Sequence, residues 1–151
     1  MFLFRKARYS DLPAIVKLLA DDPLGQSREI VSHPLDPRYE EAFAAIDGDD
    51  NQLLAVAVDA ADQVVGCLQL SFVPGLSRTG MWRGQIESVR IAAGERGSGL
   101  GSQLIEWAVE MARERGCKLV QLTSDKARPD AIRFYEKLGF IASHEGLKRN
   151  L

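Results

Sequence analysis

The chain has 151 residues, enough for one domain with a buried core, and its 46% hydrophobic and 26% charged residues are ordinary for a globular protein. The formal net charge of −2 gives no reason to expect nucleic acid or an anionic membrane as a partner. Because no apolar run reaches the roughly 18 residues of a membrane-spanning helix and no signal sequence is evident, we expect a single cytoplasmic domain over residues 1–151.

The first half of the chain is predicted to form a short strand, two helices and a hairpin. A strand over residues 2–6 precedes the first helix. Asp36 and Pro37 are typical of the N-cap and first position of the second helix. Two strands, Gln52–Val58 and Val64–Val73, follow with a tight connection between them, which is the pattern of a hairpin.

Residues 82–115 organise the second half of the chain. They are predicted to form a strand, a turn rich in glycine and an amphipathic helix whose apolar residues recur at helical spacing. A buried strand over Lys118–Thr123 comes next, and then a helix from Pro129 to about Leu138. Two short strands, Phe140–Ser143 and Leu147–Asn150, are predicted to close the fold as a hairpin.

This order of elements predicts an α/β fold of the α+β type. The sheet should be mixed but mostly antiparallel, with about six to seven strands, and about four helices should flank it. No internal repeat, low-complexity tract or linker interrupts the chain, which supports a single domain.

Cysteine and histidine give no sign of a metal site. Cys67 and Cys117 are not at metal-ligand spacing, and two cysteines make no disulfide framework, so we expect both to be reduced. His33 and His144 have no partner ligands at useful spacing and are expected in loops or at the surface. We therefore predict that the protein holds no metal.

The glycine turn between the strand and the helix has the outline of an anion site. Gly97, Gly99 and Gly101 carry no Cβ, so a phosphate group can approach the backbone there. The first N–H groups of the following helix lack internal partners, and the helix dipole adds roughly half a positive charge. A nucleotide enzyme is disfavoured, because Ser102 replaces the third glycine of a dinucleotide fingerprint and the turn lacks the lysine of a P-loop.

Three segments of the chain resemble the GNAT superfamily of N-acetyltransferases. Residues 96–101, with the pattern R-x-x-G-x-G, are similar to its acyl-CoA pyrophosphate loop. Residues 131–140, which end in FYEKLGF, are similar to its second signature, and residues 5–11, with the pattern R-x-A-x-x-x-D, are similar to its N-terminal opening. The segments occur in the family's order and together span nearly the whole chain, but none of them identifies a substrate.

The resemblance implies acetyl-CoA as a co-substrate, with its pyrophosphate against the turn and its pantetheine arm along the preceding strand. The strand's backbone N–H groups could also stabilise an oxyanion in the transition state. Arg128 stands where many members have an asparagine that binds pantetheine; Asp125 or Lys126 could replace that contact, and Arg128 could instead reach the 3′-phosphate of CoA. The other residues assigned to acetyl-CoA are Val89, Arg90 and Ile91 on the strand and Arg96, Gly97, Ser98, Gly99, Leu100, Gly101 and Ser102 in the turn.

The implied reaction is attack of an amine on a thioester, and it benefits from a base. An alkyl ammonium has a pKa of about 10.4, so only about one molecule in a thousand is nucleophilic at pH 7. Glu87 is the candidate base, because strand parity would put it on the face of Val89 and Ile91, near the point where the strands part. It could equally bind a cationic acceptor, or pair with Arg83 or Arg90.

Tyr135 is the candidate general acid for the departing thiolate. It matches the tyrosine of the FYxxxGF signature, which has this role in several members of the family. A phenol with a pKa of about 10 is protonated at neutral pH, so it suits the role without tuning. The alternative is that Tyr135 only packs on the core face of its helix.

The leading function is therefore acetyl transfer from acetyl-CoA to an amine of a small molecule or a protein. The alternative is a regulatory module of the same fold that binds acyl-CoA without turnover; Glu87 and Tyr135 favour the enzyme, because a binder needs neither. The resemblance to the family also implies that two copies of the chain can form a homodimer. The sequence does not decide the charge of the acceptor. Carboxylates near the expected site favour a cationic acceptor, namely Glu87, Asp21, Asp22 and Asp36. Arginines there equally favour an acidic one, namely Arg78, Arg83 and Arg90.

Overall fold

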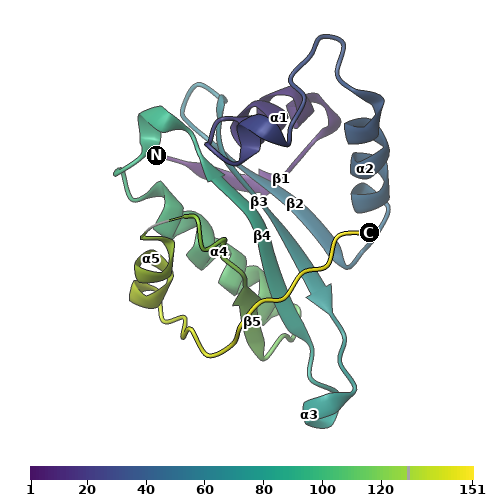
Figure 1. The fold of residues 1–151 in the computed structure, drawn as a ribbon, viewed down its shortest axis with the longest axis vertical. Helices are drawn as coiled ribbons and strands as arrows, with labels where there is room; N and C mark the ends of the chain where they lie inside the picture. Colours follow the sequence, from purple (N-terminus) through teal and green to yellow (C-terminus); the bar gives the residue numbers. More distant parts are fainter. Residues whose placement is uncertain (129) are drawn as a thin grey trace.

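The computed structural model describes residues 1–128 and 130–151, and it confirms the predicted mixed α+β fold (Figure 1). Its sheet has the strand order β1-β2-β3-β4-β5, in which all neighbours are antiparallel except the parallel pair β4 and β5. The strands are β1 (Leu3–Lys6), β2 (Gln52–Val58), β3 (Val64–Val73), β4 (Arg83–Ile91) and β5 (Leu119–Leu122). The helices are α1 (Leu12–Ala20), α2 (Pro37–Asp47), the one-turn α3 (Ser77–Gly80), α4 (Leu100–Glu114) and α5 (Ala131–Lys137).

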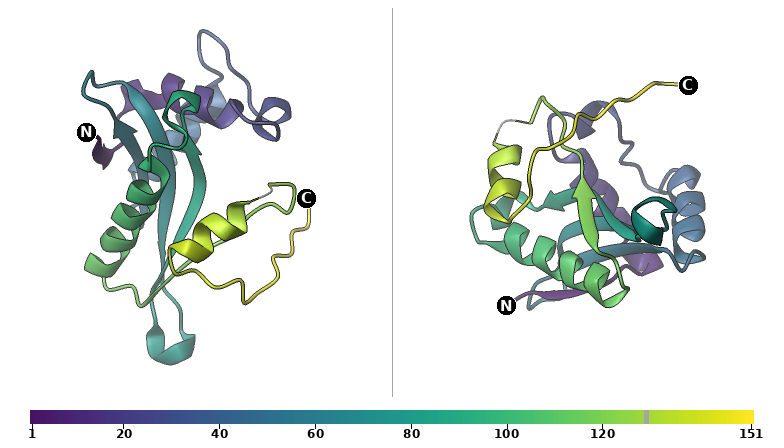
Figure 2. Two further views of the ribbon diagram at one scale, coloured as in Figure 1. Left: turned by 90° about the vertical axis from the view of Figure 1, so that its left-hand side faces the viewer. Right: turned by 90° about the horizontal axis from the view of Figure 1, so that it is seen from below.

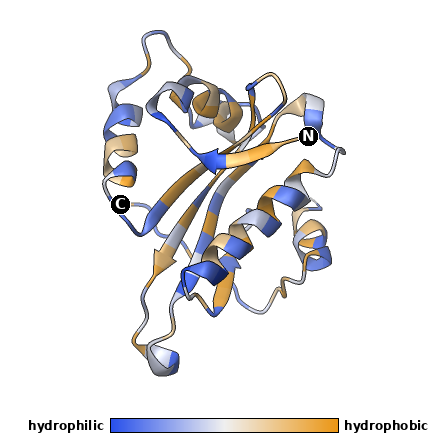
Figure 3. Cartoon of the chain, turned by 180° about the vertical axis from the view of Figure 1, so that it is seen from behind, coloured by the Kyte–Doolittle hydropathy of each residue, from blue (hydrophilic) through white to orange (hydrophobic). Residues whose placement is uncertain are grey.

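Helices cover both faces of the sheet (Figures 1 and 2). On one face Ile15 of α1 and Phe43 of α2 share a core cluster with Val56 of β2. On the other face Leu104 of α4 clusters with Leu68 of β3, and α5 packs beside it. Hydrophobic and hydrophilic residues alternate along α4 in Figure 3, as expected for a helix with one buried face. Among the described residues, no helix is long and apolar enough to cross a membrane.

The helix α4 holds β4 in place. Leu100, Leu104, Ala108 and Ala112 recur every fourth residue along α4 and are fully buried. Burial of each leucine contributes roughly 1.5–3 kcal/mol. A Cβ added at Gly84 of β4 would lie 3.0 Å from the Cβ of Ala112, so glycine lets the helix approach the strand closely. The turn between β4 and α4 is thereby anchored at both ends.

The parallel strands β4 and β5 part after a short stretch of pairing. The pairing runs from Arg83 opposite Leu119 to Ile86 opposite Leu122, and then stops. The part of β4 that follows Ile86 faces no strand on that side within residues 1–128 and 130–151. The family resemblance led us to expect this parting, and it makes room beside β4.

A β-bulge lies in β4 just beyond this point. Glu87 pairs with Gln69 of β3, but the next registered pair is Arg90 with Cys67, so β4 has one residue more than β3 here. Ser88 takes up the difference with a φ of 57°, a left-handed conformation that is uncommon for residues other than glycine.

The bulge changes which residues of β4 share a face of the sheet. An extra residue in one strand moves the side chains beyond it to the other face. Glu87 therefore shares a face with Arg90, whereas Val89 and Ile91 lie on the opposite face, in the cluster that contains α4. Our prediction that Glu87 shares the face of Val89 and Ile91 was wrong, because strand parity assumes a regular strand.

The sheet has five strands rather than the six to seven that we predicted. The closing hairpin does not form, and residues 140–151 run as an extended segment without strand pairing. Ile141 and Leu147 are 84% and 93% exposed, so the apolar pattern there has nothing of this chain to pack against. A hairpin with no surface to bury against is only marginally stable. The predicted start of the last helix, Pro129, lies outside the described residues.

Candidate active site

The turn between β4 and α4 is open. Gly97 and Gly99 have φ values of 85° and 86°, which side chains rarely adopt. A Cβ added at either glycine would meet no described atom within 4 Å beyond its chain neighbours, so the space beside both glycines is open. Gly99 is the N-cap of α4, a helix of 15 residues, whose positive dipole end therefore faces this space.

Four N–H groups of the turn are free to bind an anion. Within residues 1–128 and 130–151, no hydrogen bond uses the N–H of Gly97, Gly99, Gly101 or Ser102. The N–H of Leu100 instead donates to Oγ of Ser98 at 3.3 Å. Clustered free amides at a helix N-terminus are the usual protein ligands of phosphate groups. The turn therefore offers unpaired backbone donors to an anionic ligand.

Two other residues of the turn link it to the rest of the fold. Arg96 is exposed at the rim, and its Nη2 donates to the carbonyl oxygen of Asp21 at 3.4 Å, at the end of α1. Gly101 lies on the inner side, where an added Cβ would be 3.3 Å from Cζ of Phe134 in α5. A small residue at position 101 thus lets α4 begin against α5.

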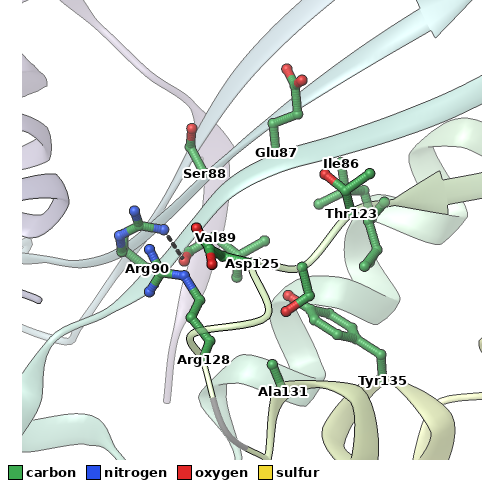
Figure 4. A pocket seen from close by; sticks show the side chains of 12 residues that line it. Ile86, Glu87, Ser88, Val89, Arg90, Thr123, Asp125, Arg128, Ala131 and Tyr135 are labelled. Atoms are coloured by element: carbon green, nitrogen blue, oxygen red, sulfur yellow. Dashed lines mark hydrogen bonds between the residues drawn. The ribbon is translucent and has the colours of Figure 1, made fainter. Parts of the chain in front are cut away.

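A pocket of about 100 Å³ lies where β4 and β5 part (Figure 4). Four parts of the chain line it: β4, the end of β5, the loop that follows β5, and α5. The lining residues are Ile86, Glu87, Ser88, Val89, Arg90, Leu122, Thr123, Ser124, Asp125, Arg128, Ala131 and Tyr135. The pocket therefore contains both predicted catalytic residues and three of the residues assigned to acetyl-CoA.

Tyr135 points from α5 into this pocket (Figure 4). Its ring makes edge contacts with Phe134 and Phe140, at centroid distances of 5.0 and 5.7 Å. Burial raises the pKa of the Tyr135 phenol above its usual value of about 10, and the positive charges of Arg128 and Arg90 oppose that shift. The hydroxyl is thus held protonated throughout the neutral range, as a proton donor requires.

Glu87 lies at the edge of the pocket, and its carboxylate points away from the pocket interior (Figure 4). The side chain is exposed, and the amide nitrogen of Gln85 lies 3.2 Å from its Oε1. Among the described residues, no lysine or arginine lies within ion-pair distance of Glu87, so the pairing with Arg83 or Arg90 that we considered is not formed. Its carboxylate is therefore available to a ligand on the face of the sheet that carries α1 and α2.

Arg90 and Arg128 are held together by Asp22, which our sequence analysis had counted among the carboxylates that would favour a cationic acceptor. Asp22, in the loop after α1, has a side chain only 9% exposed. Its Oδ2 lies 3.1 Å from Nε of Arg90, and its Oδ1 lies 3.2 Å from Nη1 of Arg128. Asp22 thus ties the α1–α2 loop to β4 and to the loop after β5, beside the pocket.

The charge of Asp22 is maintained by its partners. Burial alone would raise the pKa of this carboxyl, but the N–H of Leu24 at 2.9 Å and the charges of Arg90 and Arg128 outweigh burial and lower it. Arg28, in the same loop, pairs with Asp125 at 3.5 Å. Three arginines and two aspartates therefore meet at this side of the pocket.

The structure gathers the predicted site residues into two groups. Residues 96–102 form the turn, and Glu87, Val89, Arg90, Arg128 and Tyr135 surround the pocket, with Ile91 just beyond it. Arg128 lies beside Arg90 rather than at the turn. Thr123 and Ser124 were missed, because they follow a short strand with no polar pattern that would mark a site.

The remaining candidates lie outside this region or are inert. Cys67 is 1% exposed, and burial raises the pKa of its thiol to about 12, so it cannot act as a thiolate nucleophile at neutral pH. His33 and His144 are exposed and do not line the small pocket. The described residues contain no group of three His, Cys, Asp or Glu side chains placed to hold a metal.

Comparison with known proteins shows which family this chain matches. Residues 12–140 match the family described as Acetyltransferase (GNAT) family. The aminoalkylphosphonate N-acetyltransferase of Salmonella typhimurium is 34% identical over 117 residues, which cover 77% of this chain and 75% of that protein. The glucosamine 6-phosphate N-acetyltransferase of Trypanosoma brucei brucei is 38% identical over 90 residues, which cover 59% of this chain and 58% of that protein.

A solved structure from Bacillus halodurans C-125, described as a transcriptional regulator, is 51% identical to this chain. It matches 100% of both chains with a TM-score of 0.97. The family match covers most of the chain, including the glycine turn and the pocket. The chain therefore belongs to the acetyltransferase (GNAT) family, and we class it with the N-acetyltransferases.

Proposed function

We propose that the protein transfers an acetyl group from acetyl-CoA to an amine acceptor by direct attack. The observation that carries this proposal is the pairing of an open turn of free backbone amides with a pocket on the same strand, β4. A diphosphate on residues 96–102 would leave the rest of CoA free to follow β4 past Ile91 and Val89 to the pocket. The residues present thus fit the co-substrate, because the turn is not filled by its own side chains.

Acetyl-CoA supplies the thioester carbon that the amine attacks. As the new C–N bond forms and the C–S bond breaks, the N–H group of Val89, beside the bulge, stabilises the oxyanion. Tyr135 donates its hydroxyl proton to the leaving sulfur. Glu87 receives the amine on its own face of β4 and takes up its proton, directly or through water.

We infer that the acceptor is a small amine that also carries an acidic group. The relatives from Salmonella typhimurium and Trypanosoma brucei brucei are named for substrates that combine an amine with a phosphonate or a phosphate. In this chain Glu87 offers a carboxylate to the amine. Arg28, Arg90 and Arg128 share only two aspartates, Asp22 and Asp125, so an excess of positive charge is left beside the pocket. A protein amine beside an acidic residue would satisfy the same charges.

The test is release of free CoA thiol from acetyl-CoA in the presence of an amine panel. The panel pairs each amine with an analogue that carries a phosphonate, phosphate or carboxylate group, and mass spectrometry identifies the acetylated product. We expect turnover to be fastest with the acidic amines. Turnover without that preference would contradict the acceptor class alone, whereas no thiol release with any amine would contradict the transferase.

The second candidate function is a regulatory module that binds acyl-CoA without turnover. It is favoured by the description of the Bacillus halodurans relative as a transcriptional regulator. Two measurements together separate the functions. The module would bind acetyl-CoA saturably in calorimetry but release no thiol with any amine of the panel, whereas the transferase would do both.

A further inference from the structure

Two arginines from distant parts of the chain meet at one end of the pocket (Figure 4). Arg90 belongs to β4 and Arg128 to the loop after β5, and both line the pocket. Their side chains are only 18% and 30% exposed. Like charges in a partly buried place repel each other, so this pair needs an anion between its members. The loop after α1 supplies that anion, the carboxylate of Asp22.

Asp22 bridges the two guanidinium groups in the manner of a ligand. One of its oxygens lies 3.1 Å from Nε of Arg90, and the other lies 3.2 Å from Nη1 of Arg128. Arginines that converge on one carboxylate in this way are the usual means by which proteins bind the carboxylate or phosphate group of a small molecule. Asp22 therefore stands where the oxygens of an acidic ligand would bind.

The pairing of Asp22 is incomplete. Oδ2 of Asp22 and Nε of Arg90 are both buried, yet neither makes a hydrogen bond within residues 1–128 and 130–151. Oδ1 is shared between Arg128 and the N–H of Leu24, which donates to it at 2.9 Å. A buried polar atom without a hydrogen bond costs free energy. A phosphate or phosphonate has three acceptor oxygens, so it can offer Nε a directed acceptor and bond Arg128 as well.

The rest of the loop that carries Asp22 lies at the surface. Residues 26–34 are exposed except for Glu29. A second ion pair ties this loop to the loop after β5, that of Arg28 with Asp125 at 3.5 Å, but the two side chains are 57% and 41% exposed. Exposed pairs contribute little to stability. Release of Asp22 thus costs mainly its own pairing with the arginines, which an incoming anion replaces.

We propose that Arg90 and Arg128 form the binding site for the acidic group of the acceptor, and that this group displaces Asp22, which is the site's internal ligand. Thr123 and Ser124 also line the pocket and can donate hydroxyl protons to the remaining oxygens. An amine without an acidic group cannot replace the carboxylate, so Asp22 selects against it. That the anion belongs to the acceptor rests on the proposed function, but the anion site itself does not.

The first test is binding of inorganic phosphate, measured by calorimetry at constant ionic strength. Asp22 competes in the unmodified protein, so we expect a Kd in the millimolar range there and at least about tenfold tighter binding by Asp22→Asn. Asp47→Asn is the matched control, because it removes the same charge from an exposed pair with Lys6 and should bind phosphate like the unmodified protein. Addition of Arg128→Gln to Asp22→Asn should abolish the gain. Equal affinities of Asp22→Asn and Asp47→Asn would place the phosphate elsewhere and overturn the proposal.

The second test reads the displacement in the unmodified protein, so it does not depend on the folding of any variant. With saturating phosphate, peptides that cover residues 20–29 should exchange their amide hydrogens at least about threefold faster, because the loop has lost its buried anchor. Sodium chloride at the same ionic strength should have no such effect. Unchanged or slower exchange with phosphate would mean that Asp22 stays in place, and it would overturn the displacement.

The third test separates the acidic group of the acceptor from the phosphates of CoA. Phosphate should still bind to Asp22→Asn when CoA is saturating, because the proposed function places CoA on the turn. Loss of phosphate binding in the presence of CoA would assign the arginines to the co-substrate and overturn the proposal, and 3′-dephospho-CoA would then show which phosphate they hold. In turnover, Asp22→Asn should lower the KM of an acidic amine but not that of its neutral analogue. If no amine released thiol, the transferase would fail while the phosphate and exchange measurements still decided the anion site.

Discussion

In the function that we propose, the glycine turn and the pocket contribute to one site by different means. The turn uses the free backbone N–H groups of Gly97, Gly99, Gly101 and Ser102, and no side chain of these glycines stands in front of them. The pocket uses side chains from β4, from the end of β5 and the loop after it, and from α5. Ion pairs of Asp22 hold β4 and the loop after β5 to the α1–α2 loop. The turn should therefore set the affinity for CoA, whereas the pocket should set the rate and the choice of acceptor.

Tyr135→Phe should have the largest effect, and it tests the pocket side of this contrast. Loss of the proton donor should lower kcat about a hundredfold, while the Kd of acetyl-CoA measured by calorimetry should not change. In the unmodified enzyme, kcat should hold as the pH rises and fall only above about 10, because the acid must be protonated and burial raises the pKa of its phenol.

Tyr9→Phe is the control for the loss of a phenol hydroxyl. Tyr9 is 60% exposed and its hydroxyl donates to Oε2 of Glu40 at 2.6 Å, and neither residue lines the pocket. It should leave kcat unchanged. A fall in acetyl-CoA affinity for Tyr135→Phe, without a change in kcat, would make Tyr135 a binding residue.

Asp22→Asn should cost about 2 kcal/mol of unfolding free energy at pH 7, because it leaves Arg90 and Arg128 partly buried without their carboxylate. The pKa of Asp22 is lowered in the folded protein, so its contribution is complete above its unfolded value of about 3.9 and is lost as the pH falls through the folded pKa. Urea unfolding should therefore show the difference shrinking below about pH 4.

Asp47→Asn is the control for Asp22→Asn, because it removes an exposed ion pair and shows how much unfolding free energy such a pair contributes. Asp47 lies 3.2 Å from Lys6 with both side chains about half exposed, so its loss should cost less than about 0.5 kcal/mol. Equal losses for Asp22→Asn and Asp47→Asn would show that the pocket is not held by its charges.

The same contrast explains what the sequence could predict. Strands Gln52–Val58 and Val64–Val73 were predicted with their correct bounds, and the turn was found, because local alternation and consecutive glycines specify them. Asp22 was not recognised as a partner of Arg90, because the two residues lie far apart in the chain and only the fold brings them together.

The other misses have similar causes. The face of Glu87 was predicted wrongly, because no residue type marks the bulge at Ser88. The hairpin over residues 140–150 was predicted from a real apolar pattern, but this chain by itself offers that pattern no partner strand.

Gly99→Ala tests the turn side of the contrast. A residue with a Cβ at a φ of 86° costs roughly 1–2 kcal/mol, and relief of that strain would move the free amides. We expect the Kd of acetyl-CoA to rise about tenfold, equivalent to about 1.4 kcal/mol, with kcat nearly unchanged at saturation.

Gly80→Ala is a closely matched control. Gly80 has a φ of 71° and also has no atom within 4 Å of an added Cβ, but it is the last residue of α3, between β3 and β4. Both variants should lose similar stability, and only Gly99→Ala should lose affinity. Equal affinities would mean that the turn does not hold the co-substrate.

Glu87→Gln should have the smallest effect, and it decides how this carboxylate acts. The side chain is exposed and points away from the pocket interior, so we expect kcat at pH 7 to fall about fivefold, less than for a buried base. A base matters only while the amine is protonated, so the difference from the unmodified enzyme should shrink as the pH approaches the amine's pKa of about 10. A rise in the KM of the amine at constant kcat would instead make Glu87 a ligand of the ammonium group. Gln85→Glu, one step along the same face, should not rescue the variant if proton uptake depends on the position of Glu87 at the parting of β4 and β5.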